Sequence, residues 1–253
     1  MSLRWTHSQL VTRRVLLGLP ILALAACGDD GETSRAPEPT TPALSEVEVL
    51  RTASARIASI PSVRFALGIE GQTFVDSSGT IELLSATGSL VRPDLVDTEF
   101  KVKVLRGLTL SVRMIVLGAE RWTTDLVTGR WGPAPVEFDY EPGIIFDTAD
   151  GIGPILSSVT GAAFGVDAAI GDHLCYRVDA QVEQTIIRRL TGGTMQGTPV
   201  AVQLWIDRES FDLRRAILRE PSTTDGRVPA VWTLDFTDHG QPITIQRPVV
   251  DGG

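Results

Sequence analysis

Apolar and polar side chains alternate over Val96–Val104 and again over Leu108–Val116, and this pattern constrains the fold more than any other feature. Because successive side chains of a strand point to opposite faces, the pattern predicts two strands with one apolar face and one polar face. Arg106-Gly107 lies between the two halves, where an antiparallel pair must reverse direction. The apolar positions are Val96, Phe100, Val102, Val104, Leu108, Leu110, Val112, Met114 and Val116, and those between them include Asp97, Glu99, Lys101, Lys103, Thr109, Ser111 and Arg113.

The chain from residue 44 onward predicts one long helix followed mainly by strands. Ser45 and Glu48 have the spacing of a capping box at a helix start, and Pro61 ends that helix. Its expected apolar face consists of Val47, Leu50, Ala53, Ser54, Ile57 and Ile60. Further strands are predicted at 63–70, within 72–90, and at 174–182, 200–206, 213–219 and 231–237, with a short helix at 185–190.

The segment Glu141–Asp172 is rich in glycine and small apolar residues. It predicts short helices with gaps between them, an arrangement suited to a lid over a curved sheet, where loose packing leaves a pocket. Ordinary core helices on a sheet are the alternative.

The N-terminus predicts export and lipid anchoring. Arg13-Arg14 precedes an apolar run, Val15 to Ala26, that is too short to remain as a membrane-spanning helix. The following Leu24-Ala25-Ala26-Cys27-Gly28 resembles a lipobox, which implies a lipoprotein signal peptide over 1–26 and a lipid anchor on Cys27. A general secretory signal with a chance cysteine is the alternative, and Thr12–Leu17 also resembles a twin-arginine export signal.

Residues 27–43 are expected to comprise the lipidated cysteine and a disordered, proline-rich tether. The tether is predicted because this stretch has almost no hydrophobic content. Its 16 residues after Cys27 reach at most about 50 Å. The folded domain is expected at 44–248 and a tail at 249–253, on the extracytoplasmic face of the cell membrane.

Composition and charge exclude some classes of partner. The formal net charge of −8 makes the chain a poor candidate for binding nucleic acid or an anionic membrane surface. The two cysteines are Cys27 and Cys175, so acylation of Cys27 leaves Cys175 without a partner for an intramolecular disulfide.

The sequence contains no recognisable catalytic or metal-binding motif. The chain lacks the G-x-S-x-G of a nucleophile elbow, and His173 and His239 do not have the spacing of metal ligands. Acidic clusters at 137–141 and 147–150 do not follow the series of a calcium loop, and Gly151-Ile152-Gly153 lacks the third glycine of a dinucleotide site. We therefore expect no enzyme activity, metal or cofactor, although a Ser-His-Asp set in another chain order stays open.

Several segments in order resemble the LppX/LprG family of cell-envelope lipoproteins (LppX, LprA, LprF and LprG), which look similar in architecture to the LolA and LolB lipoprotein carriers. The matching segments are Gly88-Ser89-Leu90-Val91-Arg92-Pro93, the strand pair, Thr128-Gly129-Arg130-Trp131, Asp150–Thr160, Cys175-Tyr176-Arg177-Val178, Thr237–Ile243 and Arg247-Pro248.

The resemblance implies an α+β fold: a strongly curved antiparallel β half-barrel with helices packed on its concave face around an apolar cavity for the acyl chains of a lipid or glycolipid. The expected cavity residues are Phe100, Val102, Val104, Leu110, Val112 and Met114 on the sheet side and Ile155, Leu156, Val159 and Phe164 on the helical side. The implied role is to carry or present lipid, without catalysis, with the membrane held through the N-terminal anchor; an export or transporter partner is unknown. The alternative is a structural or interaction lipoprotein with a filled core.

Overall fold

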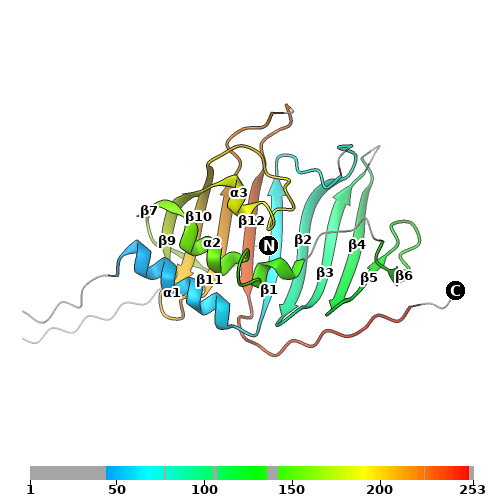
Figure 1. Cartoon of the computed structure of the whole chain (residues 1–253), viewed down its shortest axis with the longest axis horizontal. Coiled ribbons are helices and arrows are strands. Elements are labelled where there is room, and N and C mark those ends of the chain that lie inside the picture. The colour runs from blue at the N-terminus through cyan, green and yellow to red at the C-terminus, as the bar shows by residue number, and fades with distance from the viewer. Residues whose placement is uncertain (1–43, 77, 105–106, 136–141, 225, 251–253) are drawn as a thin grey trace, which may run out of the picture. The chain divides into compact units, whose positions relative to one another are not determined.

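Twelve strands form one antiparallel sheet in the computed structural model, which describes residues 44–250 except 77, 105–106, 136–141 and 225. The strand order is β6-β5-β4-β3-β2-β1-β12-β11-β10-β9-β7, and β8 also pairs with β9. No pairing joins β6 to β7 among the described residues, so the sheet is open (Figure 1). The strands are β1 (Ser62–Glu70), β2 (Glu82–Val91), β3 (Leu95–Lys103), β4 (Thr109–Leu117), β5 (Glu120–Thr124), β6 (Trp131–Pro133), β7 (Thr160–Phe164), β8 (Ala168–Ile170), β9 (His173–Val182), β10 (Val200–Asp207), β11 (Leu213–Arg219) and β12 (Val231–Thr237).

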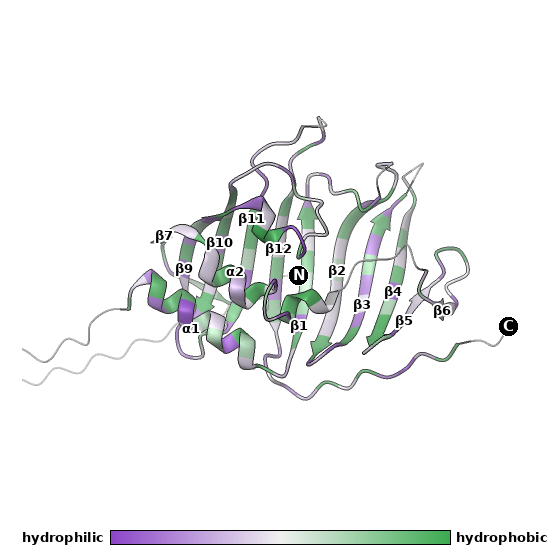
Figure 2. Cartoon of the chain, viewed as in Figure 1, coloured by the Kyte–Doolittle hydropathy of each residue, from purple (hydrophilic) through white to green (hydrophobic). Residues whose placement is uncertain are grey.

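The alternating stretch forms β3 and β4, as the pattern predicts. Phe100 lies opposite Val112 and Val102 opposite Leu110, so the apolar side chains of both strands share one face. The alternation of hydropathy along these strands is visible in Figure 2. The same face continues through the sheet, because the cross-strand partners of Phe100 form one row: Val112, Phe100, Ala86, Leu67, Leu234, Ala216, Leu204 and Val178.

The first helix, α1 (Glu46–Ser59), has the predicted capping box and ends before Pro61. Ser45 accepts a hydrogen bond from the Glu48 backbone, and the Glu48 carboxylate accepts from Ser45 in return. One position of the predicted apolar face is wrong, since Val47 is exposed and Val49 is fully buried in its place. The helix buries Val49, Leu50, Ala53 and Ile57 in the common core.

Residues 142–172 are only partly helical, which corrects the prediction that this segment consists of short helices separated by gaps. It contains the 3-10 helix η2 (Pro142–Phe146) and α2 (Ile152–Ser158), but β7 and β8 follow. Phe164 pairs with Val178 and Ala168 with Cys175, so the edge of β9 draws these residues into the sheet. Short apolar runs do not distinguish helix from strand, and the free edge of β9 decides the outcome here. The short helix expected at 185–190 is α3 (Gln184–Ile187).

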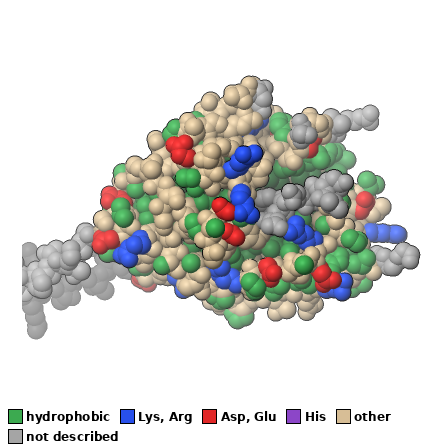
Figure 3. Space-filling model, in the orientation of Figure 1, with side chains coloured by type: hydrophobic (Ala, Val, Ile, Leu, Met, Phe, Trp, Pro, Cys, Tyr) green, Lys and Arg blue, Asp and Glu red, His purple; other side chains and the backbone are tan. Residues whose placement is uncertain are grey.

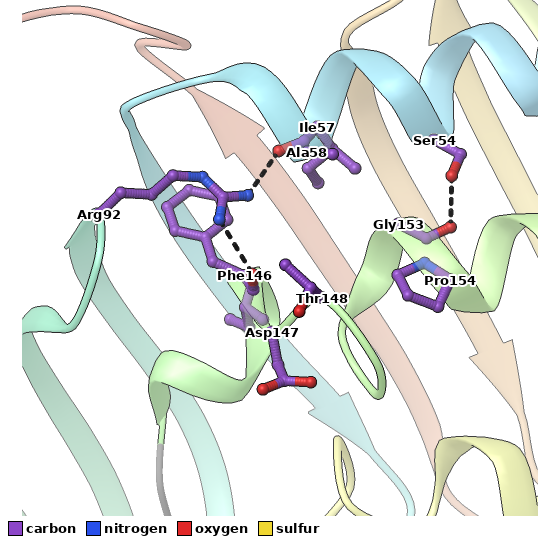
Figure 4. A pocket seen from close by; sticks show the side chains of 10 residues that line it. Ser54, Ile57, Ala58, Arg92, Phe146, Asp147, Thr148, Gly153 and Pro154 are labelled. Atoms are coloured by element: carbon purple, nitrogen blue, oxygen red, sulfur yellow. Dashed lines mark hydrogen bonds between the residues drawn. The ribbon is translucent and has the colours of Figure 1, made fainter.

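Arg92, which follows β2, fixes α1 and η2 to the sheet (Figure 4). Its guanidinium donates to the backbone oxygens of Ile57 and Ile60 at the end of α1, at 2.9 Å each, and to that of Phe146 in η2 at 3.0 Å. The group also lies 4.4 Å from the centre of the Phe146 ring. One cation therefore satisfies the carbonyl groups at a helix C-terminus and holds a second segment beside it.

A charged network between β10 and β11 also holds the last turn of α1, where Asp212 pairs with both Arg56 and Arg214. Arg56 Nε lies 2.7 Å from Asp212 Oδ1, and Arg214 Nη1 lies 3.3 Å from His239 Nδ1. His239 Nε2 lies 2.9 Å from the oxygen of Leu213, so Nε2 is the protonated nitrogen and Nδ1 accepts from Arg214. Burial lowers the pKa of His239 below its usual value, and this fold therefore holds the ring in its neutral form.

The first prediction follows from Arg92. Replacing Arg92 with Met leaves three partly buried carbonyl groups without their donor, and we expect the free energy of unfolding to fall by about 2–4 kcal/mol. Arg51→Met, which removes an exposed arginine from α1, is the matched control and should change stability little. Urea unfolding followed by circular dichroism measures both. A loss for Arg92→Met no larger than that of the control would contradict this role.

The second prediction concerns pH. Because the folded state lowers the pKa of His239, the unfolded state binds more protons, and the contribution of this residue is complete above the unfolded pKa of about 6.5. Stability should therefore decrease as the pH falls from about 7 toward 5, and His239→Gln should decrease less steeply over that range. Denaturant unfolding at each pH measures the slope, and equal slopes for the two proteins would show that His239 is not the titrating group.

Candidate functional site

A cavity of about 1050 Å³ lies against the apolar face of the sheet. Six strands contribute its largest wall, with the side chains of Phe65, Leu67, Leu83, Ala86, Phe100, Val102, Val112, Leu218, Trp232 and Leu234. The remaining walls come from connecting segments: Val75, Asp76, Ile81, Leu126, Pro135, Ile144, Ile145, Arg189, Leu190, Thr191, Gly192 and Thr194. The volume is at the upper end of the range for small-molecule sites.

Cross-strand register explains why the strand residues meet in one wall. Leu67 on β1 lies opposite Ala86 on one side and Leu234 on the other, while Trp232 lies opposite Leu218. The small side chain of Ala86 leaves space in the middle of this wall. Figure 3 shows hydrophobic side chains exposed in a hollow over the upper parts of β2 to β4.

Steric crowding in the same wall requires glycine at position 88. A Cβ atom at this position would lie 2.5 Å from the backbone oxygen of Asp97 and 2.8 Å from Cε1 of Phe65. Only glycine lets the Phe65 ring lie over the β2 backbone, and Phe65 then reaches the cavity. Gly88, the first residue of the segment Gly88–Pro93 that resembles the family, thus shapes the cavity, and Arg92 of the same segment holds α1 and η2.

The polar groups of the cavity gather at one end. Asp76, Arg189, Thr191 and Thr194 all belong to the connections after β1 and after β9. Partial burial opposes ionisation of Asp76, but hydrogen bonds from Ser78 and Thr80 and from the backbone of Ile81 hold its pKa well below the usual range. Arg189 forms an ion pair with Asp150 at the surface.

The structure brings three of the ten predicted cavity residues into the cavity wall: Phe100, Val102 and Val112. Met114 is fully buried, and Val104 and Leu110 pack against the core. Ile155 and Leu156 are buried on α2, whose main contacts are with α1, and Val159 is partly buried at the end of that helix. None of these six positions lines the cavity.

The prediction for Phe164 is wrong in its element. Phe164 lies on β7 and not on a helix, its side chain is 39% exposed, and its ring contacts Tyr176 at 5.8 Å between centroids.

Sequence reasoning also missed most of the wall. The same alternation of apolar and polar residues occurs around Leu67, Leu218, Trp232 and Leu234. That alternation predicts which side chains share a face of one strand, but it does not predict which strands become neighbours. Cys27 lies outside the described residues.

Within the described residues, no group of three or more histidine, cysteine and acidic side chains is placed to hold a metal ion. No helix among them has the length and hydrophobicity to cross a membrane. Cys175 is buried and its thiol forms no disulfide. A smaller cavity of about 180 Å³ beside Arg92 and Gly153 is below the size of ordinary ligand sites (Figure 4).

Comparisons with known proteins agree with the fold. The crystal structure of LprF from Mycobacterium bovis is similar, with a TM-score of 0.65 and 17% identity over 83% of this chain and 99% of that chain. Lipoprotein LppX from Mycobacterium tuberculosis is similar with a TM-score of 0.56 and 14% identity, over 79% of this chain and 98% of that chain. Comparison with curated proteins gave no match. Residues 46–245 match the LppX_LprAFG lipoprotein family, which confirms the resemblance seen in the sequence, and the chain belongs to that family.

Proposed function

We propose that this protein binds the acyl chains of a lipid or glycolipid in the 1050 Å³ cavity and carries or presents them in the cell envelope. The observation that supports this role best is the cavity itself, whose wall on six strands consists of hydrophobic side chains. In this proposal the sheet is a curved half-barrel, the helices pack on its concave face, and the space left between them is the lipid site.

Burial supplies the affinity. An acyl chain gains about 0.8 kcal/mol for each CH₂ group that it removes from water, so a long chain needs no polar contact along its length. The polar groups of the cavity lie at one end, around Asp76, Arg189 and Thr194, where a lipid head group would remain close to water. This separation of apolar wall and polar end suits an amphipathic ligand.

The proposed anchor is Cys27. Acylation of its thiol would hold the protein at the extracytoplasmic face of the membrane, and residues 28–43 would be the tether. Membership of a lipoprotein family supports this assignment. We propose no catalytic role for any residue.

The alternative, a structural or interaction lipoprotein with a filled core, predicts no cavity large enough for an acyl chain. It would also need a binding face on the outer side of the sheet. There Arg113 pairs with Asp97 at 3.3 Å and Ser111 donates to Glu99 at 3.1 Å, so the outer face of β3 and β4 is polar and charged, unlike the centre of a protein interface. The lipid-binding role is therefore the better supported of the two.

Replacing Val112 with Trp tests the site. The indole would project into the cavity from β4, and we expect the variant to fold but to retain at most about a tenth of the lipid bound by the wild type. Ser111→Trp places the same side chain one residue away on the exposed face, and this control should retain lipid normally. Organic extraction of detergent-free protein, followed by lipid mass spectrometry, measures retention. Normal lipid loading in Val112→Trp would contradict the assignment of this cavity.

A further inference from the structure

We propose that the loops at one end of the sheet form a docking surface for a lipid bilayer, through which the cavity exchanges its ligand. This docking surface consists of Val75, Leu108, Leu126, Val127 and Val228, all exposed. The inference deepens the proposed lipid-binding role and rests on it.

The two ends of the sheet differ in chemistry. Antiparallel register places the connections 71–81, 104–108, 125–130, 183–199 and 220–230 at one end, and 92–94, 118–119, 208–212 and 238–240 at the other. Five of the large exposed hydrophobic side chains belong to the first set, and none among the described residues belongs to the second. Single exposed valines are common on protein surfaces, but a concentration at one end marks an interaction site.

The cavity reaches the same end. Its lining includes Val75 and Leu126 of the docking surface and, from the neighbouring connection, Arg189 and Thr194. The connection 220–230 joins the connections 71–81 and 183–199, because Arg227 donates to the backbone oxygens of Gln72 and Thr194 and pairs with Glu220. A bilayer in contact with these loops would therefore face the polar end of the cavity directly.

The loop around Val127 is held in shape by its own hydrogen bonds. Asp125 Oδ1 accepts from the backbone of Val127 at 3.0 Å and of Thr128 at 2.7 Å, and Gly129 turns the chain back with a φ of +67°. These contacts leave the Val127 side chain 92% exposed at the tip. A fixed loop that presents an apolar side chain to water favours insertion into an apolar phase, since little ordering entropy is lost on docking.

A bilayer fits this surface better than a protein partner. The side chains sit on four separate loops along one end of the sheet, beside the cavity, and do not form the continuous apolar centre of a protein interface. The chain is acidic overall, and acidic groups such as Asp76 and Asp125 lie beside the docking surface. The attraction is therefore apolar, and binding should not depend on anionic lipids or on low salt.

The test uses the chain from Asp29 to Gly253, which lacks the proposed anchor. All described elements and all core residues lie between Ser45 and Thr237, so this chain contains the complete folded unit. The docking variant combines Leu108→Asp, Val127→Asp and Val228→Asp, three exposed residues that do not line the cavity. The control variant combines Val47→Asp, Val166→Asp and Leu174→Asp, exposed residues away from these loops with the same change in charge.

Flotation with phosphatidylcholine vesicles at low and high salt measures binding, and transfer of a fluorescent phospholipid measures exchange. We expect about a tenfold or greater loss of vesicle binding and of transfer in the docking variant, with the control like the wild type at both salt concentrations. Preloaded lipid should stay bound in both variants, and Val112→Trp should still bind vesicles; these readouts separate docking from lipid loading. Absence of vesicle binding by the wild type, equal loss in both variants, or self-association through these loops in place of vesicle binding would overturn the proposal.

Discussion

The structure depends on one constraint: a continuous antiparallel sheet that directs its apolar side chains to a single face. The row that runs from Val112 through Phe100, Leu67 and Leu234 to Val178 crosses eight strands without interruption. Eleven neighbouring strands extend over about 48 Å at the usual spacing, whereas the 14 residues of α1 reach only about 21 Å. The helices among the described residues are too short to cover such a face, and part of it borders the cavity and the connecting segments around that cavity.

Charged side chains hold in place the segments around the cavity. Arg92 fixes the end of α1 and η2 at one edge of the cavity, and the pair of Arg56 and Asp212 holds α1 over β10 and β11. At the other end of the sheet, Arg227 and Glu220 form a buried ion pair that joins three connections. A buried pair of this kind stabilises little in net terms, but removal of one partner is strongly destabilising. These groups fix the helices and connecting segments that surround the cavity.

Sequence patterns predicted the local structure well and the cavity only in part. The alternation of apolar and polar residues was sufficient to predict β3 and β4. The spacing of Ser45 and Glu48 was sufficient to predict the start of α1, because both signals are local. The wall required knowledge of which strands become neighbours, and this is why Phe100, Val102 and Val112 were identified while Trp232 and Leu234 were not. The prediction for Phe164 was wrong for a related reason. Its segment has a composition that suits a helix, but it pairs as a strand with the free edge of β9. The roles of Gly88 and Arg92 were not predicted, because each depends on contacts between distant segments.

Native mass spectrometry of the chain from Asp29 to Gly253, purified without detergent, tests the central claim most directly. If the cavity holds lipid, the spectrum should contain discrete added masses that organic extraction removes and that classify as lipids. The same protein should take up lipid again after extraction, because the apolar wall remains in place. A bare polypeptide mass, with no uptake from a panel of diacyl and triacyl lipids, would contradict the account and favour a structural lipoprotein.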